Sequence, residues 1–166
     1  MKEVYTKLFI GDDNDCMACS TDPGFSIVHA CQSCHQRALN YKVSLPSTHP
    51  NHLIYEYGAH LYLNMLDTPY ELDSEFTHPV FKRAMEFIHH EIKTKKLLVH
   101  CNFGYSRSPS LGLVYLAING LIPNKSLEEA LNEYVKLYPK YAPGRGIRLY
   151  MKNNWDFLMN ELLKLK

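Results

Sequence analysis

The order of apolar and polar positions along the chain predicts strands first. In the first hundred residues, short apolar or alternating runs predict β-strands at 8–10, 25–30, 54–57, 61–66 and 97–100. The last run is apolar without interruption up to His100, which is typical of a strand buried in the middle of a sheet. Segment 41–52 is rich in Pro, Ser and His and predicts a loop.

Later in the chain, apolar residues recur three and four positions apart, as they do on one face of a helix. This spacing predicts helices at about 80–92, 111–118, 127–138 and 147–165. Ser126 and Glu129 form a capping-box pattern at the start of the third helix. Strands followed by helices, with both alternating in the middle, predict an α/β fold with a central mixed β-sheet flanked by helices.

Composition and charge restrict the class of protein. The chain has 166 residues, of which 46% are hydrophobic and 21% charged, and this predicts one domain over residues 1–166. A net charge of +1 without a basic block excludes the usual signature of nucleic-acid or membrane binding. The first residues lack the pattern of a signal peptide and no segment resembles a membrane span, so we expect an intracellular, cytoplasmic protein.

Segment 97–110, LLVHCNFGYSRSPS, predicts a strand, a small polar loop and a helix start. Such a connection directs several backbone N–H groups toward one point, and the helix dipole adds positive potential there. An arginine at the far end can bind two oxygens of a phosphate. The predicted phosphate-binding residues are Asn102, Phe103, Gly104, Tyr105, Ser106 and Arg107.

Cys101 begins this loop and is the predicted nucleophile. The N–H donors and Arg107 favour its thiolate form, and a thiolate can attack phosphorus to give a phosphocysteine that water then hydrolyses. Because the loop and the arginine stabilise the phosphoryl oxygens, we expect neither a cofactor nor a metal ion in the reaction. A buried structural thiol would leave Gly104 and the loop serines unexplained.

His100-Cys101, five residues and Arg107-Ser108 match the H-C-x5-R-S/T signature of cysteine-dependent protein phosphatases. The form C-x-x-G-x-S-R-S resembles the small, atypical dual-specificity branch, and the looser resemblance extends over nearly the whole chain. It implies the protein tyrosine phosphatase-like (dual-specificity phosphatase) fold. It also implies that Ser108 hydrogen-bonds the thiolate as it leaves and that His100 supports the loop from behind.

The resemblance further implies a general acid on a separate loop that precedes the cysteine. Asp67 fits best, because it follows the strand predicted at 61–66 and precedes Thr68-Pro69, a turn that could carry it over a bound phosphate. The same carboxyl group could then act as base toward the hydrolytic water. Asp73 is the rival, although its place near a helix start suits an acid that serves the helix dipole.

The loop contains no Lys or His that would meet additional phosphates, which favours a phosphorylated protein as the substrate partner. The sequence has no phosphotyrosine-recognition loop of the tyrosine-specific branch. We therefore expect hydrolysis of phosphotyrosine, with phosphoserine and phosphothreonine as the wider alternative. Segment 141–148 lacks the asparagine that often supports the loop in this family, so that support must come from elsewhere. A phosphate-binding module without turnover is a second candidate.

Four other cysteines form two CxxC pairs, Cys16 with Cys19 and Cys31 with Cys34. With no export signal, we expect all five thiols to be reduced. A zinc-stabilised interaction domain that uses both pairs as a four-thiolate site is an alternative, although the gap between the pairs is short for one. The resemblance places the second pair close to the catalytic loop, so Cys31 or Cys34 is also a candidate disulfide partner for an oxidised Cys101.

Overall fold

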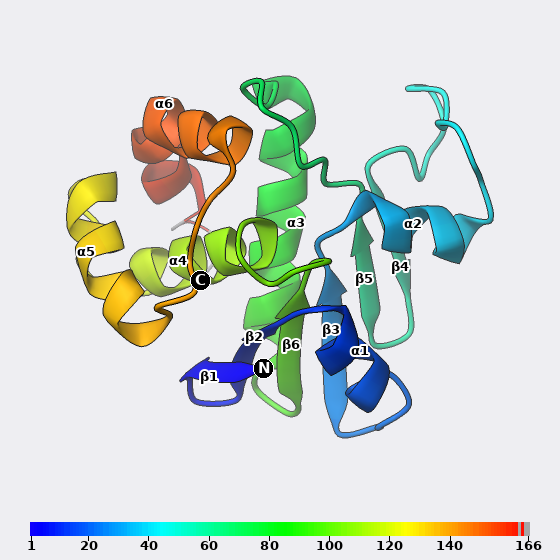
Figure 1. Ribbon diagram of the computed structural model, residues 1–166, viewed down its shortest axis with the longest axis horizontal. Helices are drawn as coiled ribbons and strands as arrows, with labels where there is room; N and C mark the ends of the chain where they lie inside the picture. The colour runs from blue at the N-terminus through cyan, green and yellow to red at the C-terminus, as the bar shows by residue number, and fades with distance from the viewer. Residues whose placement is uncertain (163, 165–166) are drawn as a thin grey trace.

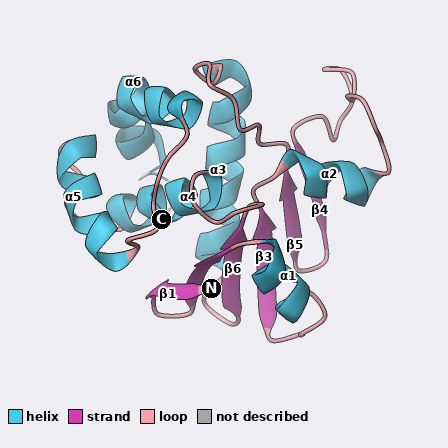
Figure 2. Ribbon diagram, viewed as in Figure 1, coloured by secondary structure: helices cyan, strands magenta, loops and turns pink. Residues whose placement is uncertain are grey.

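A computed structural model describes residues 1–162 and 164 as a mixed β-sheet with helices on both faces (Figures 1 and 2). The sheet has six strands in the order β1-β2-β6-β3-β5-β4. The strands are β1 (Lys2–Tyr5), β2 (Leu8–Gly11), β3 (Phe25–His29), β4 (Ile54–Tyr57), β5 (His60–Leu63) and β6 (Lys96–His100). The predicted α/β class and mixed sheet are confirmed.

Four parallel strands, β2, β6, β3 and β5, form the centre of the sheet, and antiparallel β1 and β4 form its edges. The carboxyl ends of parallel strands meet at the same edge of a sheet, where α/β proteins bind their ligands. The segments that follow Gly11, His29, Leu63 and His100 therefore converge at one edge. This arrangement brings Asp13, Cys31, Asp67 and Cys101 into one region.

Within residues 1–162 and 164, six helices cover the sheet: α1 (Asp13–Cys19), α2 (Gln32–Leu39), α3 (Ser74–Glu91), α4 (Arg107–Ile118), α5 (Leu127–Leu137) and α6 (Arg145–Leu162). Helices α1 and α2 lie on one face, and the other four lie on the opposite face and beside it (Figure 1). Among the described residues, no helix is both long enough and apolar enough to cross a membrane.

The two faces of the sheet have separate apolar layers. Leu97 and Val99 of β6 point into the larger core with α3 and α4, whereas Leu98 points into a smaller cluster with Cys19 of α1 and Ile27. Every residue of α4 is buried. The helix that follows the cysteine loop is thus packed on all sides, which fixes its first turn.

Several boundaries differ from the predictions. Helix α3 begins at Ser74 with Asp73 as its N-cap, earlier than the predicted start near residue 80. Strand β5 ends at Leu63 instead of residue 66. Strand β1 and helix α2 were not predicted. The predicted last helix, 147–165, corresponds to α6, and its end at 165 lies outside the described residues.

Candidate active site

Cys101 follows the last residue of β6 at the centre of the sheet and is 2% exposed. Ser108, in the first turn of α4, places its hydroxyl oxygen 3.2 Å from the sulfur of Cys101 and 3.2 Å from the carbonyl oxygen of Gly11. The hydroxyl can donate its one proton to either acceptor. Ser108 therefore lies where the sequence analysis expected it, against the thiol.

The loop between Cys101 and α4 is a narrow backbone turn. Gly104 has φ +71, and a Cβ there would lie 3.0 Å from the carbonyl oxygen of Gly11, so glycine is required for conformation and for space. Within the described part of the chain, the backbone N–H groups of residues 102–107 have no acceptor in the protein. These donors, at the start of α4, remain available to an anion.

The segment that connects α5 to α6 holds the loop from outside. The hydroxyl of Tyr138 donates to the carbonyl of Gly104 at 2.9 Å, and the N–H of Ala142 donates to the carbonyl of Tyr105 at 2.8 Å. The N–H of Gly144 donates to the hydroxyl of Ser106 at 2.9 Å. These bonds support the loop in place of the asparagine that segment 141–148 lacks, and no residue pattern in the sequence indicated them.

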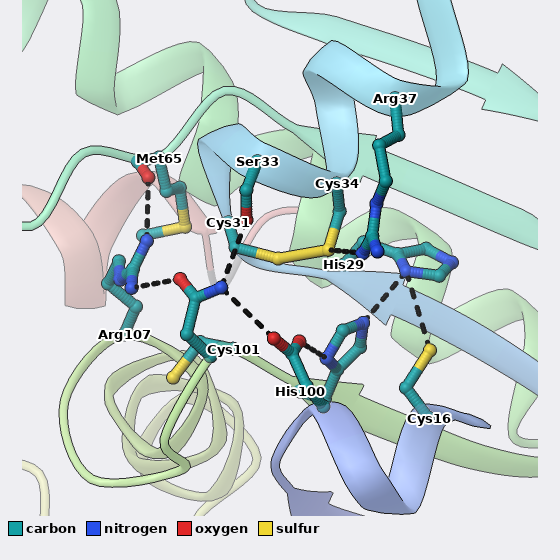
Figure 3. Close-up of a disulfide and its surroundings, with 12 residues drawn as sticks. Cys16, His29, Cys31, Ser33, Cys34, Arg37, Met65, His100, Cys101 and Arg107 are labelled. Carbon is teal, nitrogen blue, oxygen red and sulfur yellow. Dashed lines mark hydrogen bonds and ion pairs between the residues drawn. A yellow bond between two sulfur atoms is a disulfide. The ribbon is translucent and has the colours of Figure 1, made fainter. Parts of the chain in front are cut away.

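Arg107 is 5% exposed and its guanidinium is anchored at both terminal nitrogens (Figure 3). One donates to the carbonyl of Met65 at 3.0 Å and the other to Oδ1 of Asn102 at 2.8 Å. The Nε–H and the second hydrogen of each terminal nitrogen stay unused within the described residues. The guanidinium is thus fixed in orientation and keeps donors for a planar pair of oxygens.

Asp67 lies beside that guanidinium, with Oδ2 3.6 Å from Nε of Arg107 and 45% of its side chain exposed. The N–H of Gly146 donates to the carbonyl of Thr68 at 3.1 Å, which ties the Asp67 segment to the start of α6. The rival Asp73 instead caps α3 by accepting from the N–H of Glu75 at 2.8 Å. Of the two acids, Asp67 thus lies against the arginine, whereas the side chain of Asp73 caps a helix.

His100 lies behind the loop and is fully buried. Its Nε2 is 2.7 Å from Nδ1 of His29, whose Nε2 is 3.0 Å from Nδ1 of His60. Burial lowers the pKa of His100 to about 4, although the Asp13 carboxylate opposes the shift, and burial lowers the pKa of His29 to about 2. Both imidazoles are therefore neutral at pH 7.

The loop side chains divide into two groups. Asn102 points behind the loop, where its Nδ2 donates to Oδ2 of Asp13 at 3.1 Å and to the hydroxyl of Ser33 at 2.9 Å. Phe103 and Tyr105 are 71% and 49% exposed and form an aromatic rim. The backbone N–H groups of these three residues remain available for phosphate contacts.

The structure contradicts the expectation that all cysteines are reduced. Cys31 and Cys34 form a disulfide with a Cα–Cα distance of 5.5 Å, while Cys101 is a free thiol. Figure 3 shows the sulfur of Cys101 on the side of the loop away from this disulfide. In this structure Cys31 and Cys34 are thus paired with each other, and the candidate link from either of them to an oxidised Cys101 stays a prediction. The two cysteines pair with each other because the CxxC spacing at the start of α2 brings them together.

The prediction of a four-thiolate zinc site is also wrong. The sulfur of Cys16 lies 3.8 Å from Nδ1 of His29, and the thiol of Cys19 donates to the carbonyl of Asp15 at 3.0 Å. The groups of ligand-type atoms that converge combine Cys16 with histidines, and Cys31 and Cys34 with Asp13 and His100. The two CxxC pairs thus do not meet at one point.

No protein-family model matches the chain. It is similar to a crystal structure of DUSP15, with a TM-score of 0.65 and 19% identity over 99% of this chain and 95% of that one. A mouse putative dual specificity phosphatase complexed with zinc tungstate has a TM-score of 0.61 and 21% identity over 97% and 89%.

A human tyrosine phosphatase-like serine/threonine/tyrosine-interacting protein is also similar, with a TM-score of 0.56 and 19% identity over 99% of this chain and 93% of that one. At these identities the likeness concerns architecture. The chain has the fold of the small dual-specificity phosphatases, as its motif led us to expect.

Proposed function

We propose that the chain is a protein phosphatase that hydrolyses phosphotyrosine, and phosphoserine or phosphothreonine as the wider range, through a phosphocysteine intermediate. One arrangement carries the proposal: Ser108 lies 3.2 Å from the sulfur of Cys101, and Asp67, on a separate connection, lies 3.6 Å from Arg107 at the end of the cysteine loop. A candidate nucleophile, a candidate phosphate clamp and a candidate acid thus lie at the same loop, the combination that phosphoryl transfer requires.

In the first step, the thiolate of Cys101 attacks phosphorus and the P–O bond to the substrate breaks. The unpaired N–H groups of residues 102–107 and the free donors of Arg107 bind the phosphoryl oxygens, whose charge is spread in the transition state. Asp67 donates its proton to the leaving oxygen. Because 45% of its side chain is exposed, this carboxyl can reach a substrate at the mouth of the loop.

In the second step, water attacks the phosphocysteine and the S–P bond breaks. Asp67, now a carboxylate, accepts a proton from the water. The hydroxyl of Ser108 donates to the sulfur as it regains negative charge, and this bond lowers the barrier to its departure. Both steps thus use the same carboxyl group in opposite roles.

The rim favours a phosphorylated side chain with an apolar body. Phe103 and Tyr105 are exposed beside the loop, and Arg107 is the only cationic residue between positions 101 and 108. An aromatic rim can pack against the ring of phosphotyrosine. A polyphosphate or an inositol phosphate would need more cations than this segment offers.

A phosphate-binding module without turnover is the competing function. Because the chain is similar to a phosphatase-like interacting protein, an experiment should distinguish binding alone from catalysis. A module that only binds has no use for a thiol nucleophile next to a serine donor, so Cys101 and Ser108 favour catalysis.

The test is hydrolysis of matched phosphopeptides and phosphoinositides by the purified protein, with Cys101→Ser as the control. We expect phosphate release from phosphopeptides by the wild type and none above background by Cys101→Ser, which should still bind them. Equal binding and no turnover by both proteins would support the binding module instead. Turnover confined to phosphoinositides would overturn the proposed substrate class.

A further inference from the structure

A second group of reactive side chains lies behind the phosphate loop, on the opposite side from the sulfur of Cys101 (Figure 3). It combines Asp13 at the start of α1, Cys31 and Cys34 at the start of α2, and His100 at the end of β6. One ligand-type atom from each of these four residues lies within 4.8 Å of the others. The four residues follow strands that end at the same edge of the sheet. The reaction described above does not require them to lie together.

Two buried atoms in this group face only each other, at an ion-pair distance, in the described part of the chain. Oδ1 of Asp13 and Nδ1 of His100 lie 3.3 Å apart, and neither has a hydrogen-bond partner in the described part of the chain. His100 is fully buried and its other nitrogen already pairs with His29. Buried polar atoms are rarely left unpaired, because each such atom costs about 1–3 kcal/mol. A carboxylate oxygen and an imidazole nitrogen that face each other in this way can share one positive charge, either the proton of an ion pair or a metal ion.

The separation of these atoms fits a tetrahedral ion. Zinc binds histidine nitrogen and carboxylate oxygen at roughly 2.0–2.2 Å, so two such ligands at the tetrahedral angle lie roughly 3.3 Å apart. That value matches the 3.3 Å between Asp13 and His100. Nε2 of His100 lies 2.7 Å from Nδ1 of His29, so the ring has an outer hydrogen bond that orients it, here to an imidazole in place of the commoner carboxylate or carbonyl.

The charges of the group also suit a divalent cation. Two thiolates and one carboxylate carry three negative charges, so a bound Zn²⁺ would leave a net charge of about −1. The guanidinium of Arg37 lies 3.4 Å from the sulfur of Cys34 and offsets that charge. A nearby guanidinium also favours the thiolate over the thiol.

We propose that the reduced chain binds one Zn²⁺ through Asp13, Cys31, Cys34 and His100, and that formation of the Cys31–Cys34 disulfide removes the site. A dithiol reductant transfers two electrons and two protons to the disulfide, the S–S bond breaks, and the reductant becomes a cyclic disulfide. Zn²⁺ then displaces the two thiol protons to solvent as the Zn–S bonds form. Thiolate and imidazole ligands select zinc over magnesium or calcium.

The site would be joined to the phosphate loop through Asp13. Its second oxygen, Oδ2, accepts from Asn102 at 3.1 Å, and Asn102 in turn accepts from Arg107 at 2.8 Å. His100 precedes Cys101 directly. The redox state of the CxxC pair would thus decide whether a metal ion or a disulfide supports the loop from behind.

Cobalt binding to the whole protein tests the proposal, because tetrahedral Co²⁺ with thiolate ligands has a charge-transfer band. The protein is reduced with a dithiol, freed of reductant by gel filtration without oxygen, and titrated with Co²⁺ and then Zn²⁺. We expect one Co²⁺ per chain with a thiolate band that Zn²⁺ abolishes, and no band in the disulfide form. Absence of the band after reduction, or an equal band in the oxidised protein, would overturn the proposal.

Variants identify the ligands. Cys34→Ser should weaken Zn²⁺ binding by at least about 100-fold, and Asp13→Asn by about 10–100-fold. Cys19→Ser is the matched control, because Cys19 belongs to the other CxxC pair and bonds to Asp15 outside the group. Wild-type affinity in Cys34→Ser would contradict the proposal. So would loss of binding in Cys16→Ser alone, which would assign the metal to Cys16, His29 and His100.

A footprint on the wild type does not depend on whether a variant folds. Zn²⁺ should protect Cys31 and Cys34 of the reduced protein from alkylation, as mapped by mass spectrometry. Zn²⁺ should not protect Cys101, because its sulfur lies on the other side of the loop. Protection of Cys101 without protection of Cys31 and Cys34 would place the metal at the phosphate loop and overturn the proposed site.

Discussion

Oδ2 of Asp67 lies 3.6 Å from Nε of Arg107, although the two residues come from different connections at the carboxyl edge of the sheet. Arg107 is fixed by Met65 and Asn102, while Asp67 keeps 45% of its side chain exposed. An anchored cation beside a partly exposed carboxyl group suits a clamp and an acid. The first prediction separates that acid from its rival.

Asp67→Ala should lower kcat by about 10²–10⁴, because the leaving oxygen then departs without a proton. Asp73→Ala should leave kcat near the wild-type value. It should instead lower the free energy of unfolding by about 1 kcal/mol, because Asp73 caps α3. Steady-state kinetics and urea denaturation of both variants measure the two effects. The reverse pattern, with the kinetic loss in Asp73→Ala, would show that the acid is misassigned.

Gly144→Ala should lower kcat by about 10–100-fold while the chain stays folded. A Cβ at position 144 would lie 2.7 Å from Oδ1 of Asp67, so the acid must move. Gly24→Ala is the matched control. A Cβ at position 24 would lie 3.1 Å from Oδ1 of Asp22, so it also approaches an aspartate oxygen, but in the turn before β3. Equal kcat values for the two variants and the wild type would mean that the contact with Asp67 does not set the position of the acid.

Ser108→Ala should slow breakdown of the phosphocysteine more than its formation. The serine hydroxyl lies 3.2 Å from the sulfur, and loss of a hydrogen bond to a charged group costs about 1.5–3 kcal/mol, or about 10–100-fold in rate. Pre-steady-state kinetics should therefore show a burst of product followed by slow turnover. Ser110→Ala is the control, since its hydroxyl bonds to the carbonyl of Ser106. A loss of burst amplitude in Ser108→Ala would contradict this role.

Stability should fall as the pH is lowered from about 6.5 to about 4. Burial lowers the pKa of His35 and of His100 to about 4 and that of His29 to about 2, whereas an unfolded histidine titrates near 6.5. In this window the unfolded chain binds more protons than the folded chain, so the free energy of unfolding decreases by up to about 1.4 kcal/mol per pH unit for each histidine.

Urea denaturation at pH 7, 6 and 5 measures that slope. Carboxyl groups with a lowered pKa, Asp15 and Glu91, act in the same direction but below about pH 4.5. His35→Asn removes one of these histidines, so the slope of the free energy of unfolding against pH should fall by up to about 1.4 kcal/mol per pH unit. A free energy of unfolding that is constant or rises between pH 6.5 and 5 would contradict buried neutral histidines.

The fold class and the main strands could be predicted because apolar runs report burial directly. Strand β1 could not, since only Val4 of its four residues is buried. Helix α2 lacks a side-chain cap and presents a mostly polar sequence, with Cys34 and His35 as its buried positions. Where few apolar residues are buried, periodicity carries too little signal.

The motif residues could be predicted because the phosphate loop is contiguous in sequence. Contacts between distant segments could not. Tyr138 and Gly144 hold the loop by a phenol and a backbone N–H, and neither residue type signals such a role. Likewise, the pairing of Cys31 with Cys34 and the approach of Asp13 to His100 depend on the shared carboxyl edge of the sheet.

The most direct test of the account is transfer of phosphate to Cys101. A rapid quench in acid of Asp67→Ala with ³²P-labelled phosphopeptide, followed by peptide mapping, should find one labelled peptide that contains Cys101. The label should be absent from the Cys101→Ser variant. Substrate turnover without a labelled Cys101 peptide, or label that persists in Cys101→Ser, would contradict the phosphocysteine mechanism.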